Sequence, residues 1–152
     1  MTIQGGAALR KQLAFLKGEK RHKIVATIEE ARAHGDLSEN AEYHAAKEDQ
    51  GMNEARITDL EDKLARAHII DPSTITAEKV VFGATVELID LNEGTETIYQ
   101  IVGVDEANIE HGKVSITSPI ARALIGKEEG DVAVVQAPGG ERELEIQSIQ
   151  YV

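Results

Sequence analysis

The chain has 152 residues, 41% of them hydrophobic, so it is long and apolar enough to fold as one domain or two small ones rather than remain disordered. It contains no Cys, which excludes disulfides and Cys-ligated metal sites. It has neither an apolar leader nor a membrane-length apolar run, so we expect a soluble cytoplasmic protein. The formal net charge of −11 is concentrated in residues 71–152, which carry −10, so any nucleic-acid contact should come from residues 1–70.

Residues 1–70 have the apolar spacing of two helices. Seam residues recur every three or four positions in both, and in the second helix the steps of three and four alternate, as in a heptad repeat. The first series is Leu9, Leu13, Leu16, Ile24, Ile28 and Ala31, and the second is Tyr43, Ala46, Gln50, Asn53, Ile57, Leu60, Leu64 and Ala67.

The connection between the two helices is short, which makes them antiparallel neighbours. We expect Gly35 to end the first helix and Asp36 or Ser38 to cap the second. Each helix has roughly 28 residues, so the hairpin should extend about 40 Å at about 1.5 Å per residue. A hairpin of this length is not needed to close a small core, and we expect it to carry its tip away from the body of the protein.

The middle of this hairpin is partly polar. Folding about position 36 sets Lys20 opposite Asn53, so a polar layer interrupts the apolar seam and could fix its register. Asp49 and Glu54 are near enough in sequence to pair with Lys20, which is a hypothesis about this layer.

Residues 72–152 change to the alternating pattern of strands. Expected strands cover 80–89 with a break at Gly83, 97–102, 113–117, 131–137 and 144–151. Ser118 and Pro119 should begin one short helix that stops at Gly126. The predicted fold class is α+β: a two-helix antiparallel coiled-coil hairpin over residues 1–71, then an antiparallel β-sheet domain with one short helix over 72–152.

Asp36 and Glu39 are the candidate functional residues. One interpretation is structural, because Asp36 as N-cap with Glu39 three positions later is a capping box. The other is chemical, because two carboxylates at an exposed tip can supply part of the shell of Mg²⁺, which commonly takes one or two carboxylates and keeps several waters. Such a pair becomes useful where another active site supplies the remaining ligands, and the two interpretations are compatible.

Two long segments carry a family resemblance. Residues 35–48 resemble the coiled-coil tip of the GreA/GreB family of bacterial transcript-cleavage factors, and residues 115–131 are similar to that family's C-terminal signature. Residues 81–86 and 138–141 also fit, so the resemblance covers nearly the whole chain. Within the family, Leu37 and the run 41–46 favour the GreA branch over the GreB branch.

The resemblance implies a function. Family members bind RNA polymerase, insert the hairpin into its secondary channel and rescue backtracked complexes by stimulating cleavage of the extruded nascent RNA 3′ end. Asp36 and Glu39 would be the tip acids that help to hold a Mg²⁺ shared with the polymerase and orient the attacking water. The factor would then be an accessory and not an enzyme by itself.

The resemblance also assigns two binding surfaces. Arg32 and Lys47 would lie in a basic patch that contacts extruded RNA, although each could be an ordinary helix-surface charge. The C-terminal part resembles an FKBP-like domain that docks on the polymerase. Its contact region would include Ser118, Pro119, Arg122 and Lys127, while Ile120, Leu124 and Ile125 would mostly be core.

Three alternatives stay open at the level of sequence. A hairpin protein of the same fold could bind the same channel and inhibit transcription, and a helical hairpin could serve as an RNA-binding or chaperone arm. A self-sufficient metallohydrolase is the third, but one Asp–Glu pair without a pocket lacks a substrate site. We expect a monomer, no membrane association and no reading of a specific DNA sequence, because no recognition element is visible.

Overall fold

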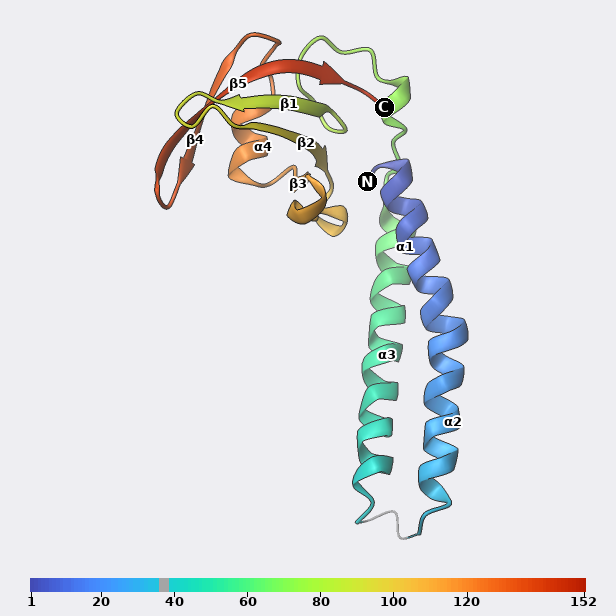
Figure 1. Cartoon of the computed structure of the whole chain (residues 1–152). Coiled ribbons are helices and arrows are strands. Elements are labelled where there is room, and N and C mark those ends of the chain that lie inside the picture. The colour runs from blue at the N-terminus through green and yellow to red at the C-terminus, as the bar shows by residue number, and fades with distance from the viewer. Residues whose placement is uncertain (36–38) are drawn as a thin grey trace. The chain divides into compact units, whose positions relative to one another are not determined.

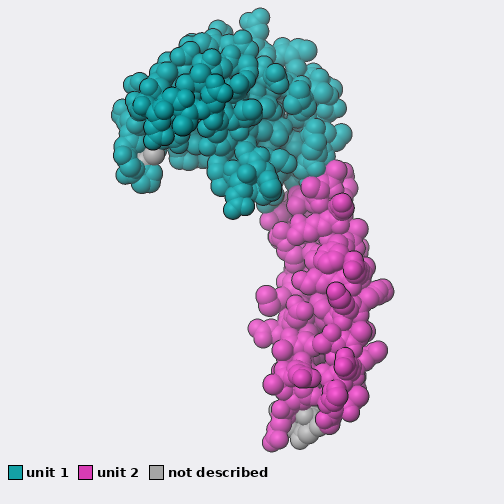
Figure 2. Space-filling model, viewed as in Figure 1, with its two compact units in different colours: residues 1–5, 68–152 teal, residues 6–67 magenta. Residues whose placement is uncertain are grey.

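A computed structural model describes residues 1–35 and 39–152, and they form two compact units (Figure 2). One unit consists of residues 6–67, and the other of residues 1–5 together with 68–152. The sequence places the boundary at 71–72, and the structure differs in assigning the first five residues to the C-terminal unit. No helix in the described part of the chain is both long and apolar enough to cross a membrane.

The first unit is a hairpin of two long helical arms that lie side by side (Figure 1). The first arm consists of α1 (Ile3–Phe15), the π-helical turn η1 (Leu16–Lys20) and α2 (Arg21–Arg32). The second arm is α3 (Ala41–Arg66), a single helix of 26 residues. The predicted hairpin is therefore present, but its first arm contains a wider π turn that the apolar spacing does not predict.

The seam of the hairpin follows the predicted heptad positions. The buried seam residues are Leu9, Leu16, Ile24, Ala31, Ala46, Asn53, Ile57 and Leu60. The other predicted positions (Leu13, Ile28, Tyr43, Gln50, Leu64 and Ala67) are half-buried. Each arm buries one stripe and leaves the rest of its surface in water, which is the pattern of a two-stranded coiled coil.

Asn53 is the polar member of this seam. It is 3% exposed, and its Nδ2 donates to the backbone carbonyl of Leu16, the first residue of η1, at 3.1 Å. Its Oδ1 is buried without a partner in the described part of the chain. Asn53 thus places a polar group in the seam as predicted, and its partner is the Leu16 carbonyl, which points toward the following residues of the first arm. Glu54 bonds Arg21 through both oxygens, at 2.8 and 2.9 Å, so the pairing predicted for Lys20 is wrong for that acid.

The second unit contains a five-stranded sheet in the order β3-β2-β1-β5-β4. The strands are β1 (Thr85–Asp90), β2 (Glu96–Val102), β3 (Lys113–Ser115), β4 (Val132–Ala137) and β5 (Gly140–Gln150). Three pairings are antiparallel as predicted, whereas β3 runs parallel to β2. The parallel pairing is possible because residues 103–112 form a crossover with two short 3₁₀ turns, η3 (Val104–Glu106) and η4 (Ile109–His111), instead of a tight hairpin.

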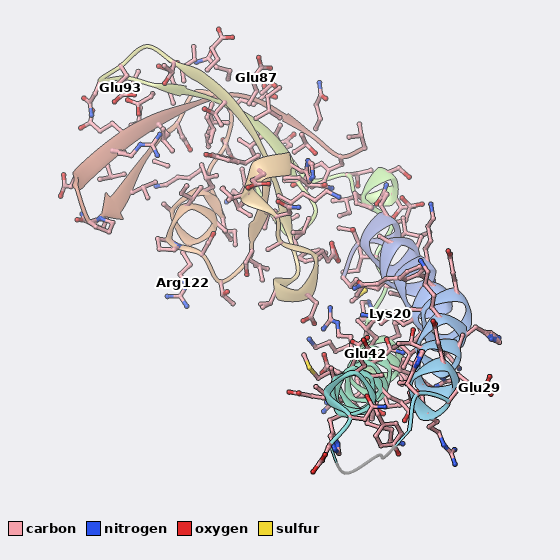
Figure 3. All side chains as sticks on the ribbon, turned by 60° about the horizontal axis from the view of Figure 1, so that its bottom comes forward. Lys20, Glu29, Glu42, Glu87, Glu93 and Arg122 are labelled. Carbon is pink, nitrogen blue, oxygen red and sulfur yellow. The ribbon has the colours of Figure 1, made fainter. Side chains whose placement is uncertain are left out.

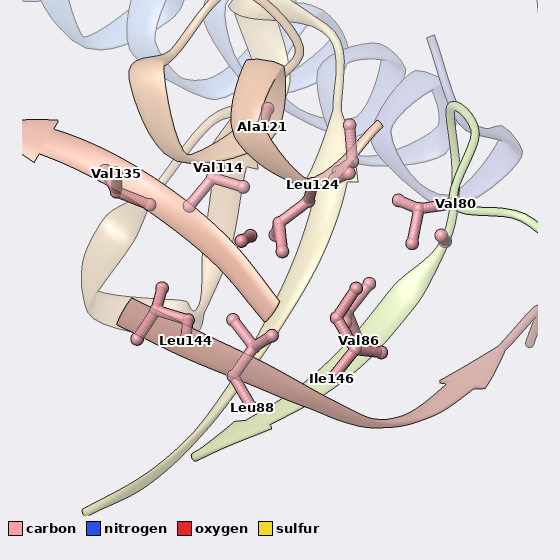
Figure 4. Packing of buried hydrophobic residues seen from close by; sticks show 12 residues of the cluster. Val80, Val86, Leu88, Val114, Ala121, Leu124, Val135, Leu144 and Ile146 are labelled. Carbon is pink, nitrogen blue, oxygen red and sulfur yellow. The ribbon is translucent and has the colours of Figure 1, made fainter. Parts of the chain in front are cut away.

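The hydrophobic core lies between one face of the sheet and the short helix α4 (Pro119–Leu124), as Figure 4 shows. The buried cluster consists of Val80, Ala84, Val86, Leu88, Ile101, Val114, Ala121, Leu124, Ala133, Val135, Leu144 and Ile146. Leu124 is core as expected and Ile120 is half-buried against it, but Ile125 is 39% exposed. Ala121 takes the buried place on α4 instead.

The segment before β1 is not the strand that its apolar residues suggest. Val80 is fully buried, but its backbone bonds Lys127 and Gly126 near the end of α4 rather than a neighbouring strand. Gly83 adopts a φ of 90°, which turns the chain just before β1 begins. The predicted break at Gly83 therefore marks the turn that precedes the strand, and residues 80–82 lie outside it. A 3₁₀ turn, η2 (Pro72–Thr74), lies upstream.

The first residues of the chain are bound to this unit by Thr2. Its backbone N–H and its hydroxyl both donate to the Glu106 carboxylate, and the hydroxyl accepts from the Gly5 N–H at 3.0 Å. Thr2 is 2% exposed, and the Ile3 N–H donates to the Ile70 carbonyl at 2.8 Å. The beginning of α1 and the segment after α3 are therefore joined by hydrogen bonds.

Asp90, at the end of β1, is 4% exposed. Its Oδ1 accepts from the backbone N–H groups of Asn92 and Glu93 at 2.9 and 3.2 Å, and Arg142 Nε donates to its Oδ2 at 3.2 Å. The Asn92 hydrogen bond is the largest cause that lowers the pKa of Asp90, burial opposes it, and the Glu93 and Arg142 contacts add to the lowering. The ionised carboxylate is thus a fixed part of the β1–β2 turn.

Replacing Asn53 with Ala should lower the free energy of unfolding of the hairpin by about 1–3 kcal/mol, because the buried Leu16 carbonyl loses its donor. Urea unfolding followed by helical circular dichroism measures this change. Met52→Ala is the matched control on α3, since Met52 is 66% exposed and its loss should change stability by less than about 0.5 kcal/mol. Equal effects of the two substitutions would contradict the role of the amide.

Asp90→Asn should lower stability most above pH about 4, the ordinary range of an unfolded Asp. Because the folded pKa of Asp90 is lowered, its stabilisation is fully present above the unfolded pKa and is lost as the pH falls through the folded pKa. The difference in unfolding free energy between wild type and Asp90→Asn should therefore shrink on acidification. Asn92→Ala keeps the backbone donor and cannot titrate, so its difference should stay constant with pH. A constant Asp90→Asn difference would refute the assignment.

Candidate functional site

The tip of the hairpin is bounded by two described helix ends. On the first arm α2 ends at Arg32 with Ala33 as its C-cap, and Gly35 follows with a φ of 122°, which favours glycine. On the second arm α3 begins at Ala41. Asp36 lies outside the described residues, together with 37 and 38.

The N-cap of α3 is Asn40, and the prediction of Asp36 or Ser38 as cap is wrong. Asn40 Oδ1 accepts from the Tyr43 N–H at 3.0 Å, and its Nδ2 donates to the Ala31 carbonyl at 2.6 Å. Sequence reasoning missed Asn40 because three cap-forming residue types occur within five positions. Its signal was the position three residues before Tyr43, a seam residue inside the first turn.

This cap changes the interpretation of Glu39. The capping box would require Glu39 at the third position of the helix, but it lies one residue before the N-cap, outside α3, and is exposed. Helix capping therefore does not account for the Glu39 side chain, and its carboxylate is available to face another molecule.

An open hollow lies beside Glu39, lined by His34, Glu39, Asn40, Ala41 and Glu42. Glu42 is the acid in the first turn of α3, where the positive end of the helix dipole favours it (Figure 3). His34 and Glu42 are not predicted as site residues from the sequence, yet both line this hollow with Glu39. Its lining includes two carboxylate residues, Glu39 and Glu42.

Carboxylates fit a hard cation such as Mg²⁺ better than a metal that prefers imidazole or thiolate. Among residues 1–35 and 39–152, no group of three or more His, Asp and Glu side chains is arranged to hold a metal ion. The described residues of the tip can thus offer part of a Mg²⁺ shell, through Glu39 and Glu42.

The two candidate RNA-binding residues both lie on helix surfaces near the tip. Arg32 is exposed and is the last residue of α2, where a cation is favourable for the helix dipole. Lys47 is exposed in the second turn of α3, and its Nζ donates to Gln50 Oε1 at 3.0 Å. Because Gln50 is neutral, this contact does not itself neutralise the positive charge of Lys47.

The four candidate docking residues divide into two groups. Ser118 Oγ accepts from the Ala121 N–H at 3.1 Å and caps α4, so its hydroxyl has a structural role, and Pro119 occupies the first helical position. Both line a largely apolar groove of about 370 Å³. Arg122 and Lys127 do not line the groove and are exposed, and Figure 3 shows Arg122 projecting away from α4.

The groove itself contains basic side chains from an otherwise acidic part of the chain. Lys113 and Arg142 both line it, beside apolar atoms of Pro119, Ile120 and Val135. The Arg142 guanidinium is already paired with the Asp90 carboxylate at 3.2 Å, so the surface of the groove is mainly apolar. A partner that fits it would present an apolar surface.

Comparison with known proteins finds similarity along both parts of the chain. The family model of the transcription elongation factor GreA/GreB N-terminal domain matches residues 1–69, and that of the GreA/GreB C-terminal domain matches residues 75–151. The chain is 57% identical to transcription elongation factor GreA of Alkalilimnicola ehrlichii, over 99% of this chain and 96% of the relative. It is 59% identical to GreA of Methylococcus capsulatus, over 100% of this chain and 97% of the relative. The crystal structure of GreA factor homolog 1 of Thermus thermophilus is 32% identical, over 99% of this chain and 97% of that one, with a TM-score of 0.43.

Proposed function

Because the chain belongs to the GreA/GreB family of transcription elongation factors, we propose that it binds RNA polymerase and stimulates hydrolytic cleavage of backtracked nascent RNA. As a monomer it inserts the hairpin into the secondary channel, so that the tip reaches the extruded RNA 3′ end and arrested complexes resume synthesis. The observation that carries the proposal is the position of Glu39, exposed at the hairpin end and outside the helix that follows it.

In this proposal Glu39 and Asp36 act together on the attacking water. The exposed carboxylate of Glu39 accepts a hydrogen bond from that water and orients it toward the scissile phosphate. Asp36 is assigned by its place in the tip motif. Bound jointly by these acids and the polymerase, Mg²⁺ would stabilise the charge on the attacking and leaving oxygens.

The chain acts as an accessory to the polymerase in this scheme. Two-metal phosphodiester hydrolysis needs more ligands than two carboxylates, together with a site that holds the scissile bond. The polymerase would supply the first metal and the RNA backbone, and the tip would complete the second metal site. The exposed cations Arg32 and Lys47 would then contact phosphates of the extruded RNA.

The C-terminal unit docks on the polymerase in the same proposal. Arg122 and Lys127 are exposed cations that can face acidic side chains of the polymerase. Pro119, three residues before Arg122, lines the apolar groove. Ser118 supports this surface indirectly, by capping α4.

The proposal is tested by adding the protein to purified backtracked elongation complexes and following labelled RNA. Asp36→Asn and Glu39→Gln should each slow cleavage by at least about 100-fold, the usual scale for losing a group that positions or deprotonates the nucleophile. Competition binding should show unchanged affinity for polymerase, since neither residue is one of the predicted docking residues of the C-terminal unit.

Glu48→Gln is the matched control, because Glu48 is another exposed acid on α3. This variant should stimulate cleavage at the wild-type rate. Unchanged cleavage in Asp36→Asn and Glu39→Gln would reject the assigned roles. Slower elongation without cleavage by the wild-type protein would indicate an inhibitor, and RNA binding without polymerase binding would indicate an RNA-binding arm.

Docking by exposed cations makes a separate prediction. Arg122→Ala and Lys127→Ala should each weaken polymerase binding about two- to fivefold at low salt, on the scale of exposed ion pairs, and less at high salt. Cleavage at saturating factor should be unchanged. Lys79→Ala removes a third exposed cation of the same unit and should leave affinity as it is. Equal losses in all three variants would point to overall charge rather than to a docking surface.

A further inference from the structure

Asn40 makes two hydrogen bonds of opposite sense at the hairpin end. Its Oδ1 accepts from the Tyr43 N–H at 3.0 Å, and its Nδ2 donates to the Ala31 carbonyl at 2.6 Å. Only this orientation of the amide satisfies both partners, because a backbone N–H donates and a carbonyl accepts. Ala31 is 2% exposed and belongs to the last turn of α2, so one planar side chain connects the end of the first arm to the beginning of the second.

Capping alone does not explain why an asparagine stands here. Ser, Asp and Asn are about equally good N-caps, since each supplies an oxygen to the first turn. Asp would place a second carboxylate oxygen against the Ala31 carbonyl, and the single oxygen of Ser cannot reach in both directions as a planar amide does. The contact across the two arms therefore selects Asn over the other caps.

Glu39 is the residue immediately before Asn40 in the chain. It precedes the N-cap, where no helical turn holds its backbone, and Asn40 itself is extended with φ −87° and ψ 96°. The two hydrogen bonds fix the Asn40 backbone relative to both arms, and thereby restrict where the neighbouring carboxylate can lie. A group that orients a water or shares a metal ion gains from such restriction, because less freedom is lost on engagement.

We propose that Asn40 is a positioning residue: its link between Ala31 and Tyr43 holds Glu39 in the place from which that carboxylate acts. The expected effect on the rate of RNA cleavage rests on the proposed function. The restraint on Glu39 is a property of the free protein. Asn40 touches neither substrate nor water in this role and works through the backbone.

The test compares Asn40→Ser, which keeps a cap oxygen and loses the link, with Asn40→Ala, which loses both. For Asn40→Ser we expect wild-type helicity and a polymerase affinity within about twofold, because the cap remains. Cleavage at saturating factor should fall about 10- to 100-fold, the scale of a misplaced reacting group, and half-maximal cleavage should need more Mg²⁺. In the free protein, the ¹⁵N order parameter of the Glu39 amide should fall from about 0.85 toward about 0.6.

A wild-type cleavage rate and Mg²⁺ requirement for Asn40→Ser would overturn the inference and leave Asn40 as an ordinary cap. So would losses of helicity and polymerase affinity as large in Asn40→Ser as in Asn40→Ala, because a structural role would then account for the slower cleavage. If the wild-type protein stimulates no cleavage, the proposed function fails, and the order parameter alone decides whether Asn40 restrains Glu39. An unchanged order parameter in Asn40→Ser then rejects that restraint as well.

Discussion

The buried hydrogen bond from Asn53 to the Leu16 carbonyl is the contact on which the geometry of the hairpin depends. Two helices that bury one apolar stripe can slide past each other by a heptad at modest cost, because Leu and Ile seams resemble one another from turn to turn. The Asn53 amide, which is 3% exposed, opposes such a slip. After a slip it would be buried without an acceptor, at a cost of about 1–3 kcal/mol. The π turn η1 begins at that same carbonyl, so the irregular turn and the polar seam residue occur together.

Hydrogen bonds between separate segments of the chain also occur at both ends of the hairpin. At the open end the Ile3 N–H donates to Ile70, and at the tip Asn40 donates to the last turn of α2. Apolar seam residues supply most of the stability, and these directional hydrogen bonds set the alignment. Asn40 meets its acceptor only if the register set by Asn53 is kept, so the position of the tip depends on a residue near the middle of the hairpin.

The sequence predicts the seam well and the tip less well, for one physical reason. Burial along a helix follows local spacing, and each predicted seam position is buried or half-buried. The choice of cap depends instead on an acceptor from the other arm, which no local pattern reveals. Asp36, Ser38 and Asn40 were equally suitable by type. The same limit explains β3, whose parallel partner was set by a crossover, and Val80, whose hydrogen bonds go to the end of α4.

The placement of Glu39 separates chemistry from stability. Glu39 lies outside α3 and outside the buried seam, so replacing its carboxylate removes no core contact and no helix cap. Asn40, one residue later, has the opposite character, because its side chain belongs to both helix ends. A scaffold built in this way can change the reactive group at its tip at little cost in folding, provided that the residue which holds it is kept. Substitution of Asn40 is therefore expected to disturb the tip more than the loss of an uncharged side chain would suggest.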